Sequence, residues 1–145
     1  MEEKNSRLTK SITLPNNVAD VPVLAEFVDG LCEELGIDVL TAMQLNLAME
    51  EAVVNVMDYA YPAETEGEVV VDAMAENGLL QFTITDHGTP FDPTSKAEVD
   101  TTLPAEERSI GGLGIHLIRK IMDEISYERA GDNNVLTLKK KINNN

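Results

Sequence analysis

The sequence predicts an α+β fold, a two-layer sandwich in which a mostly antiparallel sheet carries its helices on one face. The patterns follow one another as strand, helix, helix, hairpin, long loop, helix and hairpin, and this order contains no β-α-β repeat. Most of the β-like runs therefore belong to hairpins, whose strands pair antiparallel. The 145 residues, 43% of them apolar, suffice for one domain with its own core, and we assign residues 1–145 to a single domain.

The N-terminal part of the chain predicts an edge strand and a helix. Residues 8–14 alternate apolar and polar side chains imperfectly, and Pro15 ends the run, which is typical of an edge strand. Residues 18–35 then carry apolar side chains at helical spacing. Asp20 is expected to cap the start of this helix, and Gly36 fits the position just past its end.

A second helix is predicted to begin after Asp38 and to run to about Ala60, where Pro62 stops it. Its core-facing side chains recur near the helical period of about 3.6 residues. They are Leu45, Ala48, Ala52, Val56 and Met57. Glu51 and Asn55 are four residues apart, which places their side chains on a common helix face.

A hairpin and a long loop follow. Residues 68–75 and 79–85 are β-like runs, and Asn77-Gly78 between them is a hairpin turn signal. Residues 93–110 show no convincing period. A loop of this length inside a domain is uncommon and is usually functional or mobile.

The C-terminal part predicts a third helix and two closing strands. The helix opens at Gly111 and carries apolar residues on one side. Residues 124–129 and 134–142 read as strands around a turn at Gly131-Asp132.

The charge balance restricts the partners. The chain has 26 acidic and 11 basic residues, a net charge of −15. Nucleic acid and anionic membrane are disfavoured, because both are bound through Lys and Arg. An anionic ligand such as a nucleotide would then be held by backbone amides, a divalent cation and a few placed cations.

Cysteine usage and the N-terminus favour a cytoplasmic setting. The single Cys32 excludes an internal disulfide and is assigned to core packing. The charged N-terminal residues lack the apolar region of a signal peptide, and no apolar run approaches the roughly 20 residues of a membrane-spanning helix.

Three short motifs have residue types that suit phosphate chemistry. The amide oxygen of Asn55 can ligate a hard cation such as Mg²⁺, and Glu51 can accept or steer a proton. Asp86 at a strand end can accept a hydrogen bond from an exocyclic amine, and Gly88 allows a flat ring to approach the backbone. Each pair also has a plainer interpretation, a solvated helix face for Glu51 and Asn55 and a tight turn for Asp86-x-Gly88.

The third motif is glycine-rich. Gly111-Gly112-Leu113-Gly114 at a helix start offers unhindered amide donors and the positive end of the helix dipole, which together suit a phosphate group. Its plainer interpretation is a flexible hinge before the helix.

Taken in order, the three motifs resemble those of the GHKL ATP-binding fold, and more closely those of the bacterial anti-sigma factor serine/threonine protein kinases. The matching segments are EEAVVNVMDYAY, DHGTPFD and GLGIHLIRKIMDE. The resemblance covers the chain from about Thr9 to Lys141. Two positions depart from the family pattern: Pro90 stands where Gly is frequent, and Tyr59 where His is frequent.

The resemblance implies a role for each site residue. Asn55 would ligate Mg²⁺, Glu51 would be the general base, and Asp86 would accept from the adenine amino group while Gly88 clears space for the ring. The backbone amides of the glycine-rich segment would hold the phosphates (Gly111, Gly112, Leu113 and Gly114). The loop of residues 93–110 would close over the site as a lid. Arg108 is the candidate cation for the β- and γ-phosphates, with a solvated loop arginine as the alternative.

The resemblance also implies a function. The chain would use ATP to phosphorylate a serine of a STAS-domain anti-anti-sigma protein, and it would sequester a sigma factor while that antagonist is phosphorylated. Relatives suggest a homodimer. Two alternatives stay open: an interaction module that is regulated by ATP and ADP without significant kinase activity, and a stand-alone ATPase.

Overall fold

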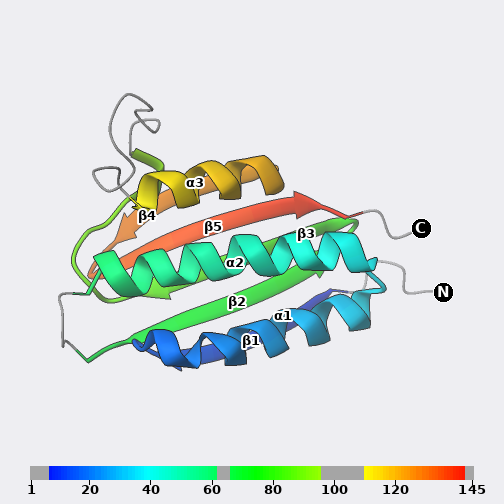
Figure 1. Cartoon of the computed structure of the whole chain (residues 1–145), viewed down its shortest axis with the longest axis horizontal. Coiled ribbons are helices and arrows are strands. Elements are labelled where there is room, and N and C mark those ends of the chain that lie inside the picture. The colour runs from blue at the N-terminus through cyan, green and yellow to red at the C-terminus, as the bar shows by residue number, and fades with distance from the viewer. Residues whose placement is uncertain (1–6, 62–65, 96–109, 143–145) are drawn as a thin grey trace.

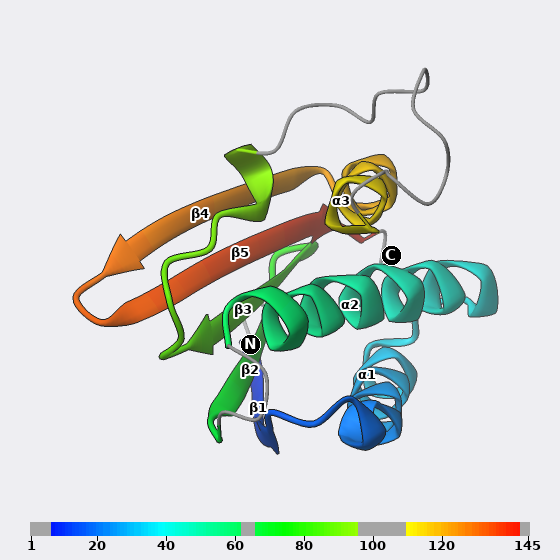
Figure 2. The same ribbon diagram turned by 60° about the vertical axis from the view of Figure 1, so that its left-hand side comes forward.

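The computed structural model describes residues 7–61, 66–95 and 110–142, with the backbone alone for 95 and 110–114. Figure 1 shows a sheet with its helices lying on one face, and Figure 2 shows the same two layers from the side. The strands are β1 (Leu8–Pro15), β2 (Glu68–Glu76), β3 (Leu79–Asp86), β4 (Glu124–Ala130) and β5 (Asn133–Lys141). The helices are α1 (Val21–Leu35), α2 (Val39–Tyr59) and α3 (Ile110–Ile121), with short 3₁₀ turns η1 (Val18–Asp20) and η2 (Pro93–Ser95).

The sheet has the order β1-β2-β3-β5-β4, and every neighbouring pair of these strands is antiparallel. The predicted α+β sandwich is therefore confirmed, and β1 lies at an edge as expected. The last strand, β5, lies between β3 and β4, so α3 carries the chain from β3 to the outer strand before the chain turns back. This order pairs Asp86 at the end of β3 with Asn134 near the start of β5.

Alternation along the strands gives the sheet one apolar face. On β2 every second residue from Val69 to Ala75 is buried, and on β3 every second residue from Leu80 to Asp86. These side chains meet the buried faces of the helices, including Leu45, Ala48, Ala52, Val56 and Met57 of α2 as predicted. Cys32 of α1 is buried in the same core.

The helix ends follow the predicted signals with one exception. The Asp38 side chain accepts a hydrogen bond from the Thr41 amide at 3.2 Å and caps α2. Gly36 ends α1 at φ +71°, in the left-handed region that glycine adopts without strain. Asp20 precedes α1 but makes no capping bond, because Asn17, three residues earlier, already caps the η1 turn by accepting from the Ala19 amide at 3.0 Å.

The predicted Asn-Gly hairpin is present between β2 and β3. Asn77 and Gly78 both have positive φ, +56° and +80°, as a tight primed turn requires.

The long loop is shorter than expected at both ends. Pro93–Ser95 forms the η2 turn, which Asp92 starts by accepting from the Thr94 amide at 2.8 Å. The helix α3 begins at Ile110, one residue before the expected position. The remaining part of the predicted lid, residues 96–109, lies outside the described residues.

Among the described residues, no helix combines the length and the apolar content that crossing a membrane requires.

Candidate functional site

The three motifs lie toward one end of the two-layer structure. α2 and α3 contact each other and run in opposite directions, so the start of α3 lies beside the C-terminal half of α2 (Figure 1). The end of β3 reaches the same place, because the Thr89 amide donates to the carbonyl oxygen of Ala60 just past α2, at 2.7 Å. The structure thus brings together Glu51 and Asn55 of α2, Asp86-x-Gly88 after β3, and the first turn of α3.

Asn55 is buried, with 2% of its surface exposed, and its amide nitrogen has no hydrogen-bond partner within the described part of the chain. Leaving a buried polar group unpaired costs about 1–3 kcal/mol. A half-turn of the amide exchanges its nitrogen and oxygen, so the same position can present an oxygen to a cation. This is the chemistry expected of a residue whose partner is a bound metal–phosphate group.

Glu51 lies one helical turn before Asn55 and is only partly buried. Burial raises the pKa of its carboxyl group, and the negative charge of Glu50 raises it further. A carboxylate with a raised pKa is a better proton acceptor than an ordinary surface glutamate. Glu50 itself is exposed.

Asp86 is buried at the end of β3, with 1% of its surface exposed. Its Oδ1 atom accepts two hydrogen bonds, from the Gly88 amide at 2.8 Å and from the Asn134 side-chain amide at 2.9 Å. Both donors fix the carboxylate in one orientation, as a ligand acceptor requires.

Asn134 is a site residue that the sequence did not reveal. It is buried, with 2% of its surface exposed, and besides Asp86 it donates to the Thr89 carbonyl at 2.8 Å. Its own side-chain oxygen accepts from the Phe91 amide at 3.1 Å and from the Tyr127 hydroxyl. The one sequence signal was a polar residue at an inward position of a strand whose next inward residues, Leu136 and Leu138, are apolar.

Gly88 is required by packing against α2. A Cβ atom at this position would lie 2.2 Å from the carbonyl oxygen of Ala60, which is backbone and cannot swing away. The predicted reason for this glycine was room for a flat ligand ring. The structure gives an additional reason within the chain itself, the close approach of the loop to the end of α2.

Phe91 and Thr94, which follow the Asp86-x-Gly88 turn, contact the neighbouring helices. Phe91 stacks on Tyr59 with ring centroids 5.4 Å apart, so the position where the family frequently has His is an aromatic contact here. Arg119 of α3 donates to the Thr94 carbonyl at 2.9 Å and holds the η2 turn against α3.

The glycine-rich segment occupies the first turn of α3. Gly111, Gly112, Leu113 and Gly114 have helical backbone. Gly111 and Gly112 are among the first residues of the helix, whose amides have no partners within it, whereas Gly114 is its fifth residue and its amide can donate to the Ile110 carbonyl. The prediction of a phosphate site here rests on those first amides and on the helix dipole. Arg108 lies outside the described residues.

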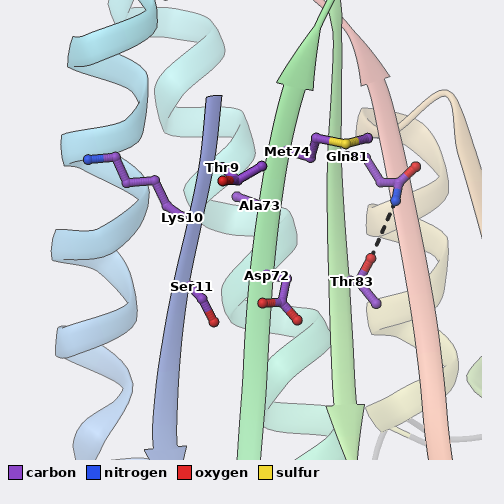
Figure 3. A pocket seen from close by; sticks show the side chains of 8 residues that line it. All are labelled: Thr9, Lys10, Ser11, Asp72, Ala73, Met74, Gln81 and Thr83. Atoms are coloured by element: carbon purple, nitrogen blue, oxygen red, sulfur yellow. Dashed lines mark hydrogen bonds between the residues drawn. The ribbon is translucent and has the colours of Figure 1, made fainter. Parts of the chain in front are cut away.

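Two surface hollows are present in the described part of the structure. One, of about 360 Å³, lies over β1, β2 and β3 on the face of the sheet that the helices leave open, away from the motifs (Figure 3). The other, of about 710 Å³, is lined by the turn from His87 to Pro90 together with Tyr61 and Arg129. It therefore touches the predicted site at Gly88, although Asn55, Glu51 and Asp86 line neither hollow.

No cluster of three or more His, Cys, Asp or Glu side chains that could hold a metal occurs in residues 7–61, 66–95 and 110–142. A divalent cation at Asn55 would therefore take most of its ligands from phosphate oxygens and water, as Mg²⁺ commonly does in phosphoryl-transfer sites.

Comparison with known proteins supports the family that the three motifs resemble. The family model for the histidine kinase-like ATPase domain matches residues 14–140. The serine-protein kinase RsbW of Listeria monocytogenes serovar 1/2a is 32% identical over 115 residues, which cover 76% of this chain and 73% of that protein. The serine-protein kinase RsbW of Halalkalibacterium halodurans is 28% identical over 124 residues, 83% of this chain and 75% of that protein.

A solved structure shares the fold. The crystal structure of the RsbU and RsbW domains of Rv1364c from Mycobacterium tuberculosis superposes with a TM-score of 0.67 at 16% identity. The match covers 92% of this chain and 32% of that chain, so the present chain spans about a third of the larger protein.

Proposed function

The chain belongs to the histidine kinase-like ATPase family, among the bacterial anti-sigma factor serine kinases, and on that premise we propose that it transfers the γ-phosphoryl group of ATP to a serine of a partner protein. One observation favours phosphoryl transfer over nucleotide binding alone. Glu51, a carboxyl group with a raised pKa, lies one turn from the buried, unpaired amide of Asn55 on the same helix. Nucleotide affinity alone does not need a carboxylate at that position, whereas a serine hydroxyl needs a base.

The remaining groups position the nucleotide in this proposal. Asp86, fixed by Gly88 and Asn134, accepts from the adenine amino group. Asn55 would hold Mg²⁺, which would neutralise the negative charge of the phosphates. The amides of the first α3 turn bind phosphate oxygens, because the helix dipole favours negative charge there. Arg108 is proposed as an added cation. Phosphoryl transfer needs mainly such positioning and charge neutralisation.

The proposed partners are those of the family. The serine belongs to a STAS-domain anti-anti-sigma protein, and its phosphorylation leaves a sigma factor captured by this chain. The proposal includes a homodimer and a cytoplasmic location, where ATP and a sigma factor are both present. The acidic composition supports protein and nucleotide partners over nucleic acid.

The test is transfer of labelled γ-phosphate from ATP, with Mg²⁺, to a STAS-domain protein from the same organism. Glu51→Gln keeps the size and hydrogen-bonding reach of the side chain but removes its basicity, so transfer should fall by about 10²- to 10⁴-fold. Glu50→Gln is the matched control, because Glu50 is the adjacent, exposed carboxylate and acts only through the pKa of Glu51, so its transfer rate should stay within about tenfold of the wild type. ADP affinity should be preserved in both.

Three outcomes separate the alternatives. Wild-type transfer by Glu51→Gln would show that Glu51 is a structural carboxylate. ADP-regulated sigma capture without transfer by the wild type would favour the interaction module. If the wild type hydrolyses ATP and phosphorylates no acceptor protein, the stand-alone ATPase is favoured.

A further inference from the structure

The outward side of α2 carries large apolar side chains in its N-terminal half. Leu40, Met43 and Leu47 are 64%, 62% and 48% exposed. Their spacing of three and four residues places them in one row along the helix, which we call the α2 seam. A helix packed on a sheet ordinarily turns polar side chains outward, and exposed apolar patches with a polar rim mark interaction sites.

The α2 seam leads along the helix to Glu51, the proposed general base. Glu51 lies one turn beyond Leu47, about 6 Å along the helix axis, and Leu40 lies about 16 Å before Glu51. An interface of ordinary size buries about 800 Å² on each partner, which corresponds to a disc of about 16 Å radius. A contact of that size centred on Glu51 therefore includes Leu47 and Met43 and extends to about Leu40 at its edge.

The charges around the seam define the chemistry of its partner. The two helices α1 and α2 and their connection contain no Lys or Arg. They contain eight acidic residues, Glu26, Asp29, Glu33, Glu34, Asp38, Glu50, Glu51 and Asp58. Asp29 is held beside the seam, because its carboxylate accepts from Asn46, the residue before Leu47, at 2.7 Å. The apolar row thus has Asp29 on its α1 side and leads to Glu51 at its C-terminal end. The last turn of α3, which carries Arg119 and Lys120, runs along the opposite side of α2 (Figure 1).

We propose that the α2 seam is the docking surface for the protein that accepts the phosphoryl group, and that this protein meets it with apolar side chains ringed by Lys and Arg. The apolar contact supplies affinity, and the charge complementarity sets the orientation and speeds the encounter. The inference rests on the proposed kinase function, because it uses Glu51 as the point that the acceptor must reach.

The first experiment measures transfer to the STAS-domain acceptor by a Met43→Ala/Leu47→Ala double variant. Both side chains are exposed, so the variant should fold and keep its ATP affinity. The KM for the acceptor should rise at least about tenfold while kcat stays within about twofold, because only docking contacts are lost. Val23→Ala, which removes an exposed apolar side chain of α1, is the matched control and should leave both constants unchanged. Raising the salt from about 0.05 M to about 0.5 M should raise the wild-type KM as well.

The second experiment does not depend on kinase activity. The probe is an 18-residue helical peptide with leucine at the a and d positions of its heptads and lysine elsewhere, compared with the same peptide carrying glutamate in place of lysine. The lysine peptide should bind the wild type and Val23→Ala, and it should bind the double variant at least about tenfold more weakly. The glutamate peptide should bind none of them.

The results separate failure of the inference from failure of the proposed function. If no acceptor is phosphorylated by the wild type, the proposed function fails, and the peptide binding still decides the docking surface. Equal kcat/KM in the double variant and the wild type, or equal peptide binding, overturns the inference. A change in the mass of the assembly, measured by light scattering on the double variant, overturns it as well, because the seam would then join two copies of this chain.

Discussion

Asn134→Ala should destabilise the fold strongly although Asn134 is a single side chain on one strand. The substitution removes a hydrogen bond to the Asp86 carboxylate at 2.9 Å and one to the Thr89 carbonyl at 2.8 Å. It also removes the oxygen that accepts from the Phe91 amide and the Tyr127 hydroxyl. A bond to a charged group contributes about 1.5–3 kcal/mol and a neutral one about 0.5–1.5 kcal/mol. We therefore expect the free energy of unfolding to fall by at least about 3 kcal/mol.

Urea denaturation followed by circular dichroism measures this loss, and Tyr127→Phe provides a graded comparison. Tyr127 donates only to the Asn134 oxygen among the bonds described, so its loss should cost about 1 kcal/mol. In the double variant the Tyr127 change should add little, because the acceptor is already gone. A loss below about 1 kcal/mol for Asn134→Ala, or full additivity of the two changes, would refute the network as the support of Asp86.

The same variant tests the link between this network and the nucleotide. ADP binds only the folded protein in this scheme, so it should raise the urea midpoint of the wild type. The increase should be smaller in Asn134→Ala, because Asp86 is no longer held by its Asn134 donor. An undiminished ADP effect would separate Asp86 from adenine recognition.

Three further changes have expected outcomes. Gly88→Ala should lower the free energy of unfolding in urea by at least about 1–3 kcal/mol, because its Cβ would meet the Ala60 carbonyl. Gly30→Ala, at an open position within α1, should raise the free energy of unfolding by about 0.5–1 kcal/mol. Equal effects of the two substitutions would contradict the packing argument. EDTA should weaken ATP binding sharply in calorimetry, and Asn55→Ala should weaken it similarly in the presence of Mg²⁺. If EDTA leaves the ATP affinity unchanged, Asn55 does not bind a metal ion. The raised pKa of Glu51 means that its ionisation opposes folding, so Glu51→Gln should raise the urea midpoint at about pH 7. It should leave the midpoint unchanged at about pH 3, well below the ordinary pKa of glutamate, where the carboxyl is protonated in both states. A gain that persists at the lower pH would show a cause other than charge.

Local signals in the sequence were sufficient for most of the fold. The Asp38 cap and the Asn77-Gly78 turn act within a few residues of themselves, so their positions could be predicted from the chain alone. The expected Asp20 cap was wrong in its bonding. Asp20 is the last residue of the η1 turn that Asn17 caps, and its backbone (φ −92°, ψ 2°) is not in the extended conformation of a capping residue.

The candidate site was predictable only in part, for a related reason. Glu51, Asn55 and Asp86 are recognisable because their motifs are contiguous in sequence. Asn134 contacts Asp86 across 48 positions of chain, and only the placement of β5 between β3 and β4 brings them together. The exposure of the α2 seam likewise depends on which sides of α2 the neighbouring helices cover, which helical periodicity does not show.

The position of β5 has a consequence for biosynthesis. Ribosomes deliver the chain from its N-terminus, so β3 emerges long before the strand that becomes its neighbour in the sheet. Until β5 follows, one side of β3 lacks its backbone partners and Asp86 lacks its Asn134 donor. A nascent chain that has produced Glu51, Asn55 and the glycine-rich turn therefore still lacks the support of its adenine contact, and its unpaired strand is a target for chaperones or for aggregation. In the proposed scheme, stalled or truncated translation products would not hold adenine as the complete chain does.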